Sequence, residues 1–263
     1  MSTAFAESPA TPRTPDASPL VTARGVPFHR LVRVELRKMI DTRAGMWMLG
    51  VMAAASLLVV AAILIWGNAA DLTYVDFLGL ATLPMAILLP ILGVMAATAE
   101  WSQRTGLVTF TLEPRRGRVV AAKVLAAILL GLVVIAAGVA AAAIGAAIGG
   151  GGVGNPTAAI LGGMLLSLLL YTVQGLAFGF LFLNTPIAIV SVLALPTLWG
   201  ILGSMIPALD RIAGWLDLER TLQPLTAGDI AGEGWLRLLT AVAVWIGLPL
   251  AVGTYRVLTR EVK

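Results

Sequence analysis

The sequence predicts an all-α membrane protein with six transmembrane helices. Hydrophobic residues make up 59% of the 263-residue chain and charged residues only 12%, whereas soluble domains carry about 25% charged residues. Six long segments also lack Asp, Glu, Lys, Arg and His. Helices of about 20 apolar residues satisfy their own backbone hydrogen bonds in lipid. The predicted spans are residues 45–66, 77–99, 124–148, 158–183, 187–206 and 238–255.

Two segments precede the first span. Residues 1–27 are rich in Pro, Ser, Thr and Ala and lack the apolar stretch of a signal peptide, so we expect a disordered cytoplasmic tail. Residues 28–43 should form an amphipathic helix on the inner membrane surface, because apolar and basic residues alternate there at helical spacing. This helix would open a transmembrane domain that covers residues 28–263. Its key residues are Phe28, Leu31, Arg33, Leu36, Arg37 and Lys38.

The distribution of basic residues predicts the orientation. Fifteen of the 18 Lys and Arg residues lie before the first span, between the second and third, or after the sixth. Six spans place these segments on one side, and the positive-inside rule makes that side cytoplasmic. We therefore expect a protein of the cytoplasmic membrane with both termini inside the cell. The basic residues adjoin membrane ends and lack interleaved aromatic residues, which favours lipid headgroups over nucleic acid as their partners.

Two connections are longer than a simple turn requires. Residues 100–118 contain apolar side chains such as Leu107 and Phe110, which predict one or two short helices that dock on another surface. Residues 207–233 show one apolar helical face and predict short interfacial or re-entrant helices on the extracellular side before the sixth span. Residues 184–186, by contrast, predict only a tight turn between the fourth and fifth spans.

A few polar or small residues inside the predicted spans are candidates for packing or binding. Gln174 is costly to expose to lipid, so we expect it to face either a substrate or another helix. Tyr171 lies one turn before it, and Trp199 lies well inside the fifth span, where an apolar substrate could pass. These three residues are the candidate lining of a substrate path.

Two glycine pairs fit the small-residue pattern of packed membrane helices. They lie in the third and fourth predicted spans, and they indicate close helix packing either within one subunit or between two subunits. The pairs are Gly145 with Gly149 and Gly175 with Gly179.

Several kinds of chemistry are missing from the chain. There is no cysteine, which excludes disulfides, thiolate metal sites and thiol catalysis, and the single histidine is His29. The predicted spans hold no titratable residue of the kind that proton-coupled carriers need at membrane depth. No phosphate-binding loop of the G-x-x-x-x-G-K-[ST] type occurs, so ATP would have to act on a partner. We therefore expect a non-enzymatic membrane subunit without a cofactor or metal of its own.

Three stretches resemble the type-2 ABC transporter permeases, also called ABC-2 permeases. The first is ELRKMIDTRAGMWML (35–49), which leads into the first span. The second is ILGVMAATAEWSQRTGLVTFTLEPRRGRVVAAKVLA (91–126), with Glu and an aromatic residue, a short coupling segment and a Pro-Arg-Arg turn. The third is the ending LPLAVGTYRVLTREVK (248–263). The resemblance covers residues 28–263.

The resemblance implies a specific assembly. Two six-span permeases pair, as identical copies or as paralogues, and each docks one ATP-binding subunit that carries ATP and Mg. Residues 28–43 become the family's elbow helix, and residues 100–112 become its coupling helix. The family's usual Gly-Thr order reads Thr105-Gly106 here. The coupling residues implied are Glu100, Trp101, Arg104, Thr105, Gly106, Leu107 and Phe110.

The functional expectation is therefore the permease subunit of an ATP-driven ABC exporter. The uncharged spans predict a hydrophobic or amphipathic substrate, because a charged group costs roughly 2.5–3.5 kcal/mol at the centre of a membrane helix. Two alternatives remain open from the sequence: a carrier or channel that needs no ATPase, and a membrane scaffold that transports nothing.

Overall fold

The computed structural model describes residues 26–150, 152, 154 and 156–260, so nearly all of the expected tail (1–27) lies outside the described residues. Within the described part, the chain is helical and forms no strand. The elements are α1 (Phe28–Ile40), α2 (Arg43–Trp66), η1 (Ala69–Asp71), α3 (Tyr74–Ser102), α4 (Gly106–Leu112), α5 (Arg116–Gly149), α6 (Ala158–Phe182), α7 (Thr185–Met205), α8 (Pro207–Leu216), α9 (Leu218–Ala227), α10 (Glu233–Val242), η2 (Ala243–Gly247) and α11 (Leu248–Thr259).

The predicted all-α, six-span fold is confirmed. Five single helices, α2, α3, α5, α6 and α7, are long and apolar enough to cross a membrane. The sixth span is the continuous run Glu233–Thr259, made of α10, the π-helical turn η2 and α11. This span is much longer than the predicted 238–255. The π-helical turn lies just before Pro249, at a point where the proline has no N–H to offer the preceding turn.

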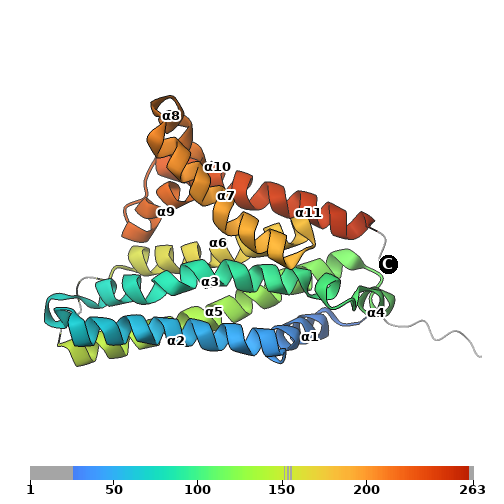
Figure 1. Cartoon of the computed structure of the whole chain (residues 1–263), viewed down its shortest axis with the longest axis horizontal. Coiled ribbons are helices and arrows are strands. Elements are labelled where there is room, and N and C mark those ends of the chain that lie inside the picture. Colours follow the sequence, from blue (N-terminus) through green and yellow to red (C-terminus); the bar gives the residue numbers. More distant parts are fainter. Residues whose placement is uncertain (1–25, 151, 153, 155, 261–263) are drawn as a thin grey trace, which may run out of the picture.

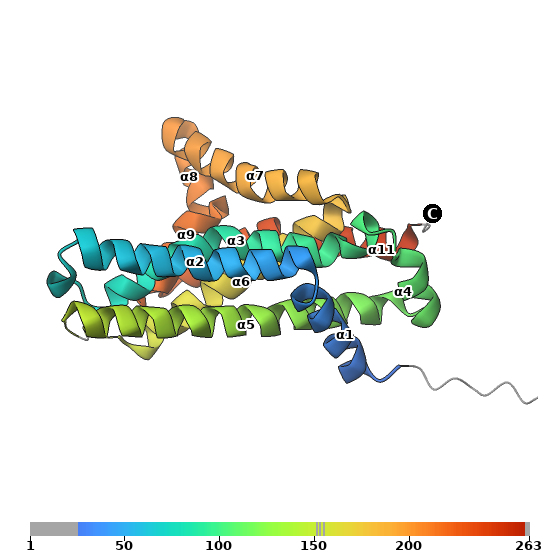
Figure 2. The same cartoon turned by 60° about the horizontal axis from the view of Figure 1, so that its bottom comes forward.

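The spans divide into a central pair and more exposed partners. In α3 and α6, 56% of the most apolar stretch is buried, against 17% in α2 and α7. In Figures 1 and 2, α2, α3, α5 and α6 run roughly parallel, whereas α7 diverges from α3 as it approaches α8. The centre of the fold is therefore the contact between α3 and α6.

Glycines allow α3 and α6 to approach backbone to backbone. A methyl group added to Gly175 would lie 1.9 Å from the carbonyl oxygen of Pro90, and one on Gly93 would lie 2.3 Å from that of Thr172. A methyl group on Gly179 would meet the Cβ of Ala97 at 2.6 Å. The Gly175–Gly179 pair thus packs within the subunit.

The second glycine pair also packs inside the chain. On α5, a methyl group on Gly145 would lie 2.6 Å from Val60 of α2, and one on Gly149 would lie 3.0 Å from Ala69 of η1. Of the two interpretations that the sequence left open, packing within one subunit accounts for both pairs.

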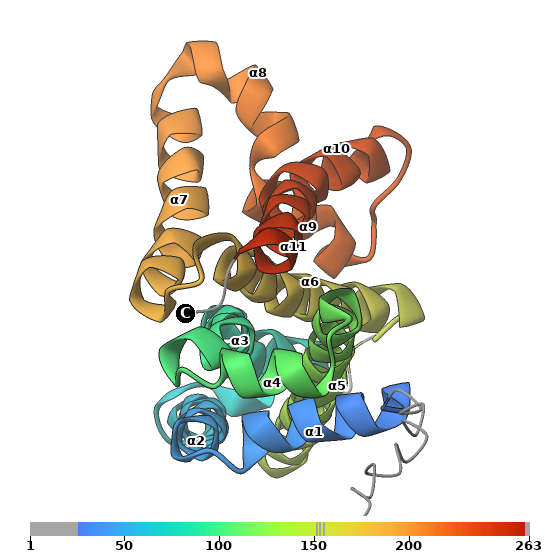
Figure 3. The ribbon, with the colours of Figure 1, turned by 90° about the vertical axis from the view of Figure 1, so that its right-hand side faces the viewer.

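The connecting segments gather at the two ends of the bundle. In the end-on view of Figure 3, α1, α4 and the last turn of α11 lie together, and we call this the α4 end. The opposite ends of α6 and α7 carry α8 and α9, which are the short helices predicted within residues 207–233. The tight turn at residues 184–186 is confirmed, because α7 begins at Thr185 directly after the N-cap residue Asn184.

The contact between α3 and α6 makes Gly175→Ala a test of the fold. The added methyl group must displace the Pro90 carbonyl, so we expect a loss of about 1–3 kcal/mol in unfolding free energy. The control is Gly162→Ala on α6, since no described atom lies within 4 Å of its added methyl group. Unfolding of both purified variants in mixed detergent micelles measures the difference. Equal stability of the two variants would contradict the packing.

Candidate functional site

Four charged residues form a buried cluster at the α4 end. Glu35 and Lys38 come from α1, Glu100 from the last turn of α3, and Lys123 from α5. Lys123 Nζ lies 2.6 Å from Glu35 Oε2 and 2.7 Å from Glu100 Oε1, and it also donates to the carbonyl oxygen of Ala96 at 3.1 Å. Lys38 Nζ lies 2.7 Å from Glu35 Oε1 and 3.0 Å from Glu100 Oε1. We call these four residues the ionic cluster.

Burial makes the ionic cluster a strong structural constraint. Glu35, Glu100 and Lys123 are 5%, 3% and 4% exposed, and two cations neutralise two anions. An unpaired buried charge would cost several kcal/mol, so each member depends on the other three. Burial alone would lower the pKa of Lys38, but the charges of Glu100 and Glu35 outweigh it and raise this pKa. The cluster therefore holds α1, α3 and α5 together.

This geometry corrects two sequence expectations. The helices α3 and α5 extend beyond the predicted spans and include Glu100 and Lys123, so the long helices are not free of ionisable residues. The predicted spans ended at the first charge, although these charges are neutralised inside the chain. Glu100 was assigned to the coupling segment, as the acidic residue at the end of the second span; it lies in the last turn of α3, outside α4, and pairs within the ionic cluster.

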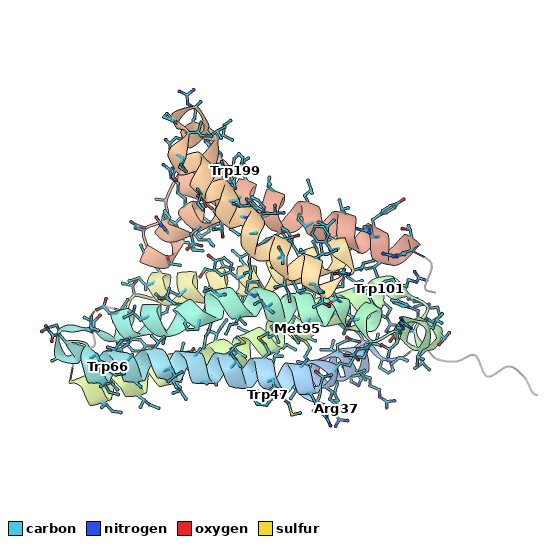
Figure 4. The ribbon with its side chains drawn as sticks, in the orientation of Figure 1. Arg37, Trp47, Trp66, Met95, Trp101 and Trp199 are labelled. Atoms are coloured by element: carbon cyan, nitrogen blue, oxygen red, sulfur yellow. The ribbon has the colours of Figure 1, made fainter. Side chains whose placement is uncertain are left out.

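The coupling helix itself is shorter than expected. Its helical part is α4, and Trp101 belongs to α3, where the guanidinium of Arg260 lies 5.5 Å from its ring centre (Figure 4). Arg104 adopts a left-handed backbone conformation with φ of 55° in the turn between α3 and α4. Thr105 precedes α4, and Gly106 begins it and is buried.

One face of α4 is apolar and exposed. Leu107, Val108 and Leu112 are 55%, 61% and 72% exposed. The other side is held in place, because Arg116 of α5 stacks over the ring of Phe110 at 4.8 Å. Val108 and Leu112 belong to the segment 100–112 for which the sequence predicts docking, and they extend the apolar pattern of Leu107 by one position and one turn. This exposed face is the strongest candidate for a docking surface at the α4 end.

Two arginines tie the α4 end to neighbouring segments. Arg118 Nη1 lies 2.9 Å from the buried carboxylate of Glu113, and its Nη2 donates to the carbonyl oxygen of Val26. Arg116 donates to the carbonyl oxygens of Val257 and Arg260 at the end of α11. The ends of α1, α4, α5 and α11 thus form one connected surface.

The amphipathic helix predicted over residues 28–43 is present as α1, which ends at Ile40. Leu31 and Leu36 pack against the main hydrophobic core, whereas Phe28, Arg33 and Arg37 are exposed; Figure 4 shows Arg37 pointing away from the bundle. Lys38 differs from the other basic residues because it joins the ionic cluster. In the sequence, the only sign that Lys38 forms an ion pair inside the fold is Glu35, one turn earlier on the same helix.

A second candidate site is a cavity of about 680 Å³ between α3, α6 and α7, closed at one end by the start of α9. We call it the α7 cavity. Tyr171 and Gln174 both line it, as the candidate path requires. Tyr171 donates to Glu219 Oε2 at 2.5 Å. Trp199 lies on the upper part of α7 in Figure 4 and is absent from the described lining of the cavity, so it is not joined to the other two residues.

Carboxylates surround the α9 end of this cavity. Asp217 and Glu219 line it, and Asp210 lines the adjoining space. Arg220, the neighbouring cation, pairs with Asp210 at 2.7 Å, and this hydrogen bond raises the pKa of the guanidinium. Sequence reasoning did not find Asp217 and Glu219, which are 46 and more residues from Tyr171 along the chain and meet it only in the fold.

Comparison with known proteins assigns this chain to no family. No protein-family model matches this chain, and a search of the curated proteins returns no match. Across the described residues, no group of three or more His, Asp or Glu side chains is arranged to hold a metal ion.

The ionic cluster predicts a large effect of Lys123→Ala. Removing this ammonium leaves two buried carboxylates with Lys38 alone, so we expect a loss of about 3–5 kcal/mol in unfolding free energy. The control is Arg237→Ala, which breaks the exposed pair with Glu233 and should cost about 0–1 kcal/mol. Unfolding in mixed micelles measures both variants. Similar losses in the two would contradict a structural role of the cluster.

The raised pKa of Lys38 predicts how its contribution depends on pH. A pKa that is higher in the folded than in the unfolded protein stabilises the fold below the ordinary value of 10.5, and this stabilisation is lost as pH rises through the folded pKa. The stability difference between the wild type and Lys38→Met should stay constant from neutral pH up to that ordinary value and shrink above it. A difference that shrinks already between pH about 6 and 8 would argue against the assignment.

Proposed function

We propose that this chain is the membrane subunit of an ATP-driven exporter of the ABC-2 type. In this proposal it resides in the cytoplasmic membrane with the α4 end in the cytosol, pairs with a second copy or a paralogue, and binds one of two ATP-binding subunits. The observation that carries the proposal is the exposed apolar face of α4, which is attached to α3 and α5, the two helices that the ionic cluster joins to α1. The proposed role is that of a transporter subunit, with ATP and Mg held by the partner.

The rigidity of the α4 end supports mechanical coupling. Only three residues separate α3 from α4, and the ionic cluster joins the end of α3 to α1 and α5. The stacking of Arg116 on Phe110 holds the far side of α4 to α5. A partner that moved α4 would therefore move α1, α3 and α5 together, because separating these helices would expose the buried charges of the ionic cluster.

The charge of the α4 end supports its cytosolic placement. This end carries Arg33, Arg37, Arg104 and Arg115, which are all exposed. Basic residues beside membrane helices remain on the cytoplasmic side and contact anionic lipid headgroups there. Both ends of the described chain lie at this end, so the six-span topology would leave both termini in the cytosol.

A cation-coupled carrier is the second candidate function. The observation that favours it is the pair of carboxylates, Asp217 and Glu219, at the α7 cavity, since coupling ions need such ligands. A carrier of this kind would need no ATPase. Whether an ATP-binding chain accompanies the protein therefore discriminates between the two functions.

The exporter proposal is tested by affinity purification from the membranes of the source cell. We expect an ATP-binding chain with a phosphate-binding loop to copurify and to hydrolyse ATP. The variant Val108→Glu with Leu112→Glu should lose at least about 90% of this chain, because two charges on the docking face oppose apolar contact.

The matched control is Ile212→Glu, which places a charge on an exposed apolar residue of α8, far from the α4 end. This variant should keep the ATP-binding chain. Absence of any ATP-binding chain from the wild-type preparation, or its retention by the α4 variant, would refute the coupling role.

A further inference from the structure

The polar groups of the α7 cavity differ in whether they are already satisfied. The hydroxyl groups of Thr197 and Ser204 donate to carbonyl oxygens of their own helix, and Tyr171 donates to Glu219. The Nε2 amide of Gln174 lines the cavity on a residue that is 2% exposed, yet among the described residues it has no hydrogen-bond partner. Buried polar groups are nearly always paired, so this amide indicates a missing acceptor.

The walls and the end of the cavity differ in polarity. Leu83, Ile87, Val192 and Leu193 are among the apolar residues that form its walls from α3 and α7. The end near α9 instead carries carboxylates. Counting the adjoining space, three carboxylates (Asp210, Asp217 and Glu219) face a single arginine, Arg220, so this end has an excess of negative charge. A molecule that complements both regions has an apolar body and a positive charge at one end.

We propose that the α7 cavity binds an amphiphile with a single positive charge, its cation against Asp217 and Glu219 and its apolar body between α3, α6 and α7. A carbonyl or ether oxygen of the ligand would accept from Gln174 Nε2. The volume of about 680 Å³ suits a drug-sized molecule or a lipid-like cation. This inference rests on the proposed export function, for which it names the substrate class.

The first experiment uses two ions of the same shape and opposite charge. Tetraphenylphosphonium and tetraphenylborate are each dialysed against the full-length protein in phosphatidylcholine nanodiscs, with empty nanodiscs as the blank. We expect saturable binding of the cation, and binding of the anion no greater than to the blank. Asp217→Asn with Glu219→Gln should weaken cation binding about tenfold. These two substitutions keep the N-cap of α9 and the hydrogen bond from Tyr171.

The matched control neutralises two other acids at the same end of the molecule. Asp229→Asn with Glu233→Gln changes the net charge equally, and neither residue lines the cavity in the described part of the chain. This variant should bind the cation as the wild type does. Unsaturable binding to the wild type, or equal weakening in both double variants, would overturn the proposal in favour of a cavity filled by lipid chains or of a general surface-charge effect.

The second experiment tests the amide. Rhodamine 6G is a cation that carries an ester carbonyl, whereas tetraphenylphosphonium has no acceptor. Gln174→Leu should weaken rhodamine 6G binding about fivefold, as expected for one buried hydrogen bond, and leave tetraphenylphosphonium binding unchanged. An equal effect on both cations would show that the variant disturbs the cavity as a whole and would remove Gln174 from the proposal.

Failure of this inference can be told apart from failure of the proposed function. Binding in nanodiscs needs no ATPase, and copurification of the ATP-binding chain needs no ligand. An ATP-binding chain without cation binding would leave the exporter and reject this substrate class. Cation binding without an ATP-binding chain would keep the site and reject ATP-driven coupling.

Discussion

The packing of the helices at the α4 end depends on the mutual neutralisation of the four charges in the ionic cluster. Two buried carboxylates, the buried ammonium of Lys123 and the half-buried ammonium of Lys38 come from three helices and lie within hydrogen-bond distance of one another. Each buried charge would be costly alone, so the arrangement of α1, α3 and α5 is fixed at the α4 end of the bundle. The position of α4 follows, because it joins the ends of α3 and α5. The proposed transmission of force from a cytosolic partner depends on this single constraint.

In the middle of the bundle, close backbone contact at glycines, and not charge, fixes the packing of α3 against α6. Gly93 and Gly175 let α3 and α6 approach so closely that the two helices act as one support, while α7 diverges from them. The space left between support and diverging helix is the α7 cavity, and α9 closes it with carboxylates. The α4 end is therefore held by paired charges, whereas the α7 cavity carries a buried amide, that of Gln174, without a partner among the described residues. This division fits the proposed function, in which an ATP-binding subunit acts on the α4 end and the substrate binds in the α7 cavity.

The sequence predicted the spans well because long apolar segments have few other structural solutions in a chain of this composition. It placed their ends less well, since Glu100 and Lys123 look like termination signals until their partners are known. Their partners on α1 are Lys38 for Glu100 and Glu35 for Lys123, which lie 62 and 88 residues away in sequence, and no local pattern reveals such pairing. Tyr171 and Gln174 were found because polar residues at membrane depth are costly. Asp217 and Glu219 were missed because acids in a loop are usually solvated.

The ionic cluster also imposes an order on biosynthesis. When the first two spans have been made, Glu35 and Glu100 face Lys38 alone, and one negative charge is left over. The compensating ammonium of Lys123 is synthesised only at the start of the third span. Before the third span is made, the ionic cluster therefore lacks one of its two cations, and the contact of α1 with α3 is not yet stabilised by Lys123.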